Sequence, residues 1–173
     1  MMEVVMSYEI NIIAINQKEP VKLNFASKII LQNEKDDYMV NRYAKIWPYF
    51  SNTSGVLYSL VMKMNEEYYS SFPICDSDFE TEIQEYFLPT CLLEENKENL
   101  TPFIVREPFI QEFIEILQYL LENSPQKRIL FQTRYQGGEQ EIIVGVIKMK
   151  KFLEMLKSKK VLFNVCYIVE SDC

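Results

Sequence analysis

The stretch "PFIQEFIEILQYLLENSPQKRILFQTRYQGGEQEIIVGVIKMKKFLEMLKSKKVLFNVCYIVE", residues 108–170, decides the fold. Its first part, Pro108–Ser124, predicts a helix because its apolar residues recur at helical spacing. Proline suits the first helical position, where its missing N–H would have no partner in any case. Pro125 should end the helix. The predicted apolar face consists of Phe109, Ile110, Phe113, Ile114, Leu117, Leu120 and Leu121.

The rest of this stretch predicts two strands, a short helix and a closing strand. Residues 128–136 alternate, and the pair Gly137-Gly138 predicts a tight hairpin into a strand over 139–147. Residues 148–158 predict a short basic helix, and residues 160–170 a strand with Phe163, Val165 and Tyr167 in the core. This order indicates the α+β class, as a single domain with a mostly antiparallel sheet and packed helices.

The first half of the chain has weaker signals. Tyr8–Asn16 predicts a strand, and residues 21–31 predict a second strand that pairs back on it, because Val21, Leu23 and Phe25 alternate. Residues 38–50 predict a short helix. Residues 55–64 fit either a helix or a buried strand.

Composition limits the functional classes. The length of 173 residues, with 48% hydrophobic and 25% charged residues, predicts one globular domain over 1–173. No apolar run is long enough to span a bilayer, and no secretory signal is visible at the N-terminus. The cysteines, Cys75, Cys91, Cys166 and Cys173, form no C-x-x-C pair, so thiols are expected rather than disulfides. We therefore expect a cytoplasmic protein without a membrane partner; the oligomeric state is not readable.

The chain contains no histidine. Histidine is the commonest general base and the commonest transition-metal ligand, so most hydrolase and metalloenzyme mechanisms lose their main group. We expect no catalytic residues, no metal and no cofactor. The acidic isoelectric point also argues against a nucleic-acid partner, which requires a basic surface.

The segment "CDSDFETEIQEYFLPTCLLEENKE", residues 75–98, holds eight acids and one base, so the whole formal net charge of −7 falls within it. Ser77 and Glu80 fit a capping box, and Phe79, Ile83, Tyr86 and Phe87 form an apolar stripe of the helix that would follow. A solvated helix whose early acids complement the macrodipole is one interpretation. It leaves the acids beyond the first turn unexplained, because like charges at helical spacing repel.

The alternative interpretation is a patch that meets a basic protein partner. Tyr68 and Tyr69 stand just before the acids, and aromatic residues rimmed by charge are typical of interface hot spots, although most aromatic residues are core. The predicted partner-binding residues are Asp76, Asp78, Glu82, Glu85, Glu94, Glu95, Glu98, Tyr68 and Tyr69.

Other site motifs fail on spacing. A Ca²⁺ loop starting at Asp76 would need Gly at its sixth position and Glu at its twelfth, where Thr81 and Phe87 stand. Ser70 and Ser71 lie in no G-x-S-x-G elbow, and Gly137-Gly138 lacks the spacing of a phosphate loop.

The C-terminal part, with its helix, the strands around Gly137-Gly138, the basic helix and the terminal strand "FNVCYIV", resembles the immunity proteins of bacterial contact-dependent growth inhibition and related polymorphic toxins. The similarity covers roughly the last 65 residues. It implies a cytoplasmic protein that binds and neutralises one cognate toxin domain, often a nuclease, without catalysis of its own. The family has no common functional residues that could be assigned to positions in this sequence.

Together these observations predict an immunity protein that occludes a basic toxin domain through the acidic segment. Two alternatives stay open: a small carboxylate-based or metal-dependent hydrolase, and a regulatory protein-binding module.

Overall fold

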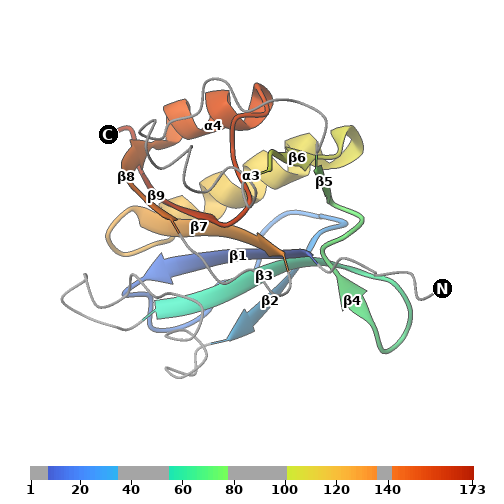
Figure 1. Cartoon of the computed structure of the whole chain (residues 1–173). Helices are drawn as coiled ribbons and strands as arrows, with labels where there is room; N and C mark the ends of the chain where they lie inside the picture. The colour runs from blue at the N-terminus through green and yellow to red at the C-terminus, as the bar shows by residue number, and fades with distance from the viewer. Residues whose placement is uncertain (1–7, 35–54, 78–100, 136–141) are drawn as a thin grey trace.

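The structure, a computed structural model, describes residues 8–34, 55–77, 101–135 and 142–173. Its main sheet has the strand order β2-β3-β1-β7-β9-β8 (Figure 1). The strands are β1 (Tyr8–Ile15), β2 (Ile30–Glu34), β3 (Gly55–Lys63), β7 (Arg128–Tyr135), β8 (Ile142–Lys148) and β9 (Val165–Glu170). All neighbouring pairs on this path are antiparallel except β8 and β9, which are parallel. The α+β class is confirmed, and the segment that fits either a helix or a buried strand forms a strand over Gly55–Lys63.

The predicted pairing of residues 21–31 with the first strand is wrong. The segment before β2 is irregular, and β2 pairs with β3 while β1 lies between β3 and β7. Side chains bind its backbone instead: the Val21 N–H donates to the Tyr58 hydroxyl at 2.9 Å, and the Lys28 N–H donates to the Glu112 carboxylate at 2.9 Å. The alternation of Val21, Leu23 and Phe25 reflects their partial burial against the core.

The predicted hairpin around Gly137-Gly138 is also wrong. β7 and β8 follow each other in sequence, but β9 lies between them in the sheet and pairs with both. The closing strand takes the position that a hairpin partner would have had. The register of β8 against β9 shifts between Val144 and Val146, which marks a bulge at Gly145.

Both described helices lie on one side of the sheet (Figure 1). A 3-10 turn (η2, Glu107–Phe109) that contains Pro108 leads into α3 (Ile110–Glu122), and α4 (Met149–Lys157) follows β8 directly. The helices predicted over 108–124 and 148–158 are therefore confirmed. Their apolar faces bury against the sheet around an aromatic cluster, in which neighbouring ring centroids lie 5.0–6.0 Å apart. Its members are Phe103, Phe113, Phe131, Phe152, Phe163 and Tyr167.

The opposite face of the sheet carries a second, smaller apolar cluster. It contains Ile13, Ile15, Leu57, Leu130 and Cys166, and no residue of α3 or α4 belongs to it. The strands in the middle of the sheet are therefore buried on both faces, which explains why β1 reads as a nearly continuous apolar run.

Short strands complete the described part of the chain. β4 (Tyr69–Ser70) pairs with the end of β3, and β5 (Cys75–Ser77) pairs with β6 (Phe103–Val105). Phe163, Val165 and Tyr167 are buried as predicted, although β9 begins only at Val165. None of Cys75, Cys166 and Cys173 is in a disulfide. Neither described helix has the length and apolar character needed to cross a bilayer. The predicted helices over 38–50 and within 78–87, together with Cys91, lie outside the described residues.

Candidate functional site

The largest exposed aromatic side chains of the described residues gather around β4. Tyr68 is 52% exposed, Tyr69 37% and Phe72 46%, and Met64 in the preceding turn is 49% exposed. We call these four residues the β4 surface. Large apolar side chains that are exposed together mark an interaction site more often than scattered ones do.

A hairpin holds the β4 surface in place. Met62 and Lys63 of β3 pair with Ser70 and Tyr69 of β4, and the Met64 N–H donates to the Tyr68 carbonyl at 2.8 Å. The buried Ser71 hydroxyl donates to the Leu60 carbonyl at 2.6 Å. These bonds fix the backbone on both sides of the tyrosines, so their rings are presented from an ordered support.

Phe72 joins this surface to a charged pair. Its ring stacks on Tyr8 at 5.8 Å, and the Arg106 guanidinium lies 5.5 Å from its centroid. Arg106 also lies 3.4 Å from the Asp76 carboxylate, whose side chain is 53% exposed. The predicted binding residue Asp76 is therefore exposed beside the β4 surface, but its charge is partly balanced by a surface ion pair of the kind worth about 0–1 kcal/mol.

Three of the nine predicted partner-binding residues, Tyr68, Tyr69 and Asp76, are described, and all three are exposed in this region. The other six lie outside the described residues: Asp78, Glu82, Glu85, Glu94, Glu95 and Glu98.

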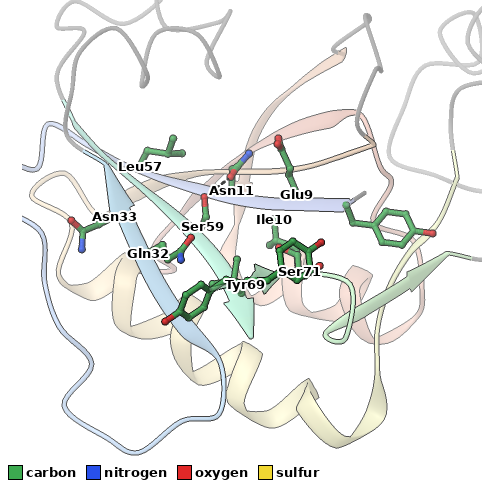
Figure 2. Close-up of a pocket in the computed structure, with 13 residues that line it drawn as sticks. Glu9, Ile10, Asn11, Gln32, Asn33, Leu57, Ser59, Tyr69 and Ser71 are labelled. Atoms are coloured by element: carbon green, nitrogen blue, oxygen red, sulfur yellow. Dashed lines mark hydrogen bonds between the residues drawn. The ribbon is translucent and has the colours of Figure 1, made fainter. Parts of the chain in front are cut away.

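A cleft of about 370 Å³ opens next to the β4 surface, on the sheet face away from the helices. Tyr68 lines it. Tyr69 also lines it, as do Asn11 of β1, Gln32 of β2 and Ser59 of β3 (Figure 2). Its volume is at the lower end of the range of about 300–1,000 Å³ found for ligand pockets.

The floor of the cleft is a row of polar residues across three strands. Asn11 lies opposite Ser59, and Ser59 lies opposite Gln32, so the three side chains share one face of the sheet. The Ser59 hydroxyl donates to Asn11 Oδ1 at 2.9 Å. Asn11 is only 4% exposed, and its Nδ2 has no hydrogen-bond partner among the described residues. A buried polar atom without a partner costs about 1–3 kcal/mol, so this amide donor is left unsatisfied at a stability cost.

The charge of the cleft is negative. Among the described residues that line it, Glu9 is the only one with a formal charge. Arg134 lies opposite Glu9 in the register of β7, but it does not line the cleft. Glu66 and Glu67 are exposed in the turn directly before Tyr68. The cleft and its rim therefore favour a neutral or cationic ligand over an anionic one.

The described residues offer little for catalysis. Burial raises the pKa of the Cys75 thiol to about 12, so this thiol is not an activated nucleophile. No three carboxylate or thiol groups of the described residues lie close enough to hold a metal ion.

Sequence reasoning missed the polar row, because its residues come from three separate strands. One signal was available: Asn11 interrupts the apolar run of β1 at a position where both faces of the strand are buried.

No protein-family model, no curated protein and no solved structure matches the chain. The resemblance to immunity proteins stays a prediction.

Proposed function

We propose that the protein is a cytoplasmic immunity protein that binds a basic toxin domain and occludes its active or substrate-binding surface. The observation that carries this proposal is the β4 surface, where Tyr68, Tyr69, Phe72 and Met64 are exposed together on an ordered hairpin. Tyrosines of this kind are enriched among the residues that dominate binding energy at protein interfaces.

The charge distribution supports a basic partner. Residues 75–98 hold the whole net charge of −7, and this segment begins at β5, beside the β4 surface. Complementary charge raises association rates and excludes partners of the wrong sign. In this proposal the aromatic side chains supply affinity, and the acids supply speed and selectivity.

The candidate partner is the variable C-terminal toxin domain of a protein encoded by a neighbouring gene. Binding is measured by surface plasmon resonance at several salt concentrations. The double variant Tyr68→Ala/Tyr69→Ala should weaken the complex at least about thirtyfold, because two hot-spot residues each cost more than about 1 kcal/mol. Val146→Ala is the matched control, since Val146 is 48% exposed on β8, at the far edge of the sheet.

Charge reversal at Glu82 and Glu85 tests the electrostatic part. It should slow association and reduce its salt dependence without unfolding the domain. If the tyrosine variant binds as tightly as Val146→Ala, the β4 surface is not the interface. If no neighbouring toxin domain binds at all, the immunity function is wrong.

A further inference from the structure

The cleft beside the β4 surface has the chemistry of a site for a basic peptide segment. We infer that it receives a segment of the protein partner, with an arginine side chain directed to Glu9 and a main-chain carbonyl oxygen that accepts from Asn11 Nδ2. This inference rests on the proposed protein-binding function and names what the partner must insert.

The first argument is continuity. Tyr68 and Tyr69 belong to the exposed β4 surface and also line the cleft. A protein that covers these rings therefore reaches the mouth of the cleft without a separate binding step. Continuity of this kind favours a loop of the same partner over an unrelated small molecule.

The second argument is the buried amide. Asn11 is 4% exposed and lines the cleft, Ser59 holds its Oδ1 at 2.9 Å, and its Nδ2 has no partner among the described residues. The bond from Ser59 orients the amide, so Nδ2 is the atom left to donate. A peptide carbonyl oxygen is an uncharged acceptor that every extended segment carries.

The third argument is charge and shape. Glu9 is the only formally charged residue among the described ones that line the cleft, and the amide oxygens of Gln32 and Asn33 add further acceptors. Two tyrosine rings stand at the wall. Arginine fits this set better than lysine, because its planar guanidinium carries five donors and also stacks on aromatic rings.

The test uses a blocked amino acid rather than the partner. N-acetyl-arginine N-methylamide is titrated into the ¹⁵N-labelled chain, and N-acetyl-glutamine and N-acetyl-glutamate N-methylamides serve as the neutral and acidic comparisons. We expect the arginine probe to bind most tightly, with shift changes concentrated at residues 9–11, Ser59 and Tyr69. Shift changes spread over the whole surface, or equal binding of the glutamate probe, would overturn the inference.

Two variants separate the two contacts. Glu9→Gln should reduce arginine-probe affinity about two- to fivefold and leave the glutamine probe unchanged, as expected for a partly exposed ion pair. Glu122→Gln, at the exposed end of α3, is its matched control. Asn11→Val should weaken both probes about two- to tenfold, the equivalent of one lost hydrogen bond. Thermal unfolding of each variant confirms that it is folded.

The outcomes distinguish the inference from the proposed function. A chain that binds the arginine probe in the cleft but binds no neighbouring toxin domain refutes the immunity function and keeps the cleft. A toxin complex whose affinity survives both Glu9→Gln and Asn11→Val refutes the cleft and keeps the function. Tighter binding of glucose or adenosine than of the arginine probe would make the cleft a small-molecule site and overturn the inference.

Discussion

The hydroxyl of Tyr58 anchors the irregular segment that sequence patterns mistook for a strand. Tyr58 is fully buried in β3; its hydroxyl donates to Gln17 Oε1 and accepts the Val21 N–H at 2.9 Å. Gln17 in turn donates from Nε2 to the Asn123 carbonyl at the end of α3, at 3.1 Å. One phenol oxygen therefore ties β3, the segment before β2 and the helix end together.

The variant Tyr58→Phe removes that oxygen and leaves the ring in place. The variant loses free energy of unfolding because two groups lose their hydrogen-bond partner: the side-chain amide oxygen of Gln17 (Oε1) and the main-chain N–H of Val21. With a penalty of about 1–3 kcal/mol for each such group, partly relieved where water reaches it, we expect a loss of about 2–4 kcal/mol. The assay is urea unfolding followed by circular dichroism, in which the midpoint should fall while the slope stays constant.

Tyr119→Phe is the matched control. Its hydroxyl donates to the Lys22 carbonyl of the same segment at 2.7 Å, but this bond is exposed, so water can replace it. We expect a loss of about 0.5–1 kcal/mol for this variant. If Tyr58→Phe costs no more than Tyr119→Phe, the buried phenol does not anchor the segment and the reasoning fails.

Two further predictions concern titration. Burial raises the pKa of Cys75 from 9.0 to about 12, so its contribution to stability is complete below pH 9 and is lost as the pH rises toward 12. Cys75→Ala should therefore lose less free energy of unfolding between pH 9 and 12 than the parent chain, measured by urea unfolding at each pH; an equal loss would contradict this. A hydrogen bond from Lys148 and a second from Arg128 lower the pKa of Glu170, so its contribution is present above the ordinary value of 4.5 and is lost as the pH falls below it. Glu170→Gln should flatten the acid limb of the stability curve, measured by urea unfolding at each pH; an acid limb as steep as that of the parent chain would contradict this.

Local patterns predicted the elements of the C-terminal half well, because α3 and α4 each bury one strongly periodic face, and β7 and β9 are apolar segments with buried residues on both faces of the sheet. The pairing of the strands was not predicted correctly. Whether β8 neighbours β7 depends on where the closing strand inserts, and β9 buries Val165, Tyr167 and Val169 in the same core that α4 covers. A glycine pair predicts a turn, but it does not decide which strand occupies the adjacent position.

The candidate site also has features that the sequence could predict and features that depend on strand pairing. The exposure of Tyr68 and Tyr69 could be expected from the sequence, because their neighbours along the chain are polar; their role in binding stays a prediction. The cleft was not, since the opposition of Asn11, Ser59 and Gln32 arises only from the register of three strands. The charge of residues 75–98 was visible at once, because net charge depends on composition and requires no knowledge of pairing.

The polar row has a stability cost that can be measured, and that cost argues for a role in recognition. Ile13 and Leu57, the next residues on this face of β1 and β3, are buried apolar side chains, and a valine at position 11 would continue their cluster. Asn11→Val should raise the free energy of unfolding by about 1–3 kcal/mol, because it removes a buried donor that has no partner among the described residues. The same variant should weaken binding of the arginine probe. Stabilisation together with lost binding is the signature of a residue kept for function at the expense of the fold. If Asn11→Val instead destabilises the chain, the amide supports the sheet, and its free donor is no sign of a ligand.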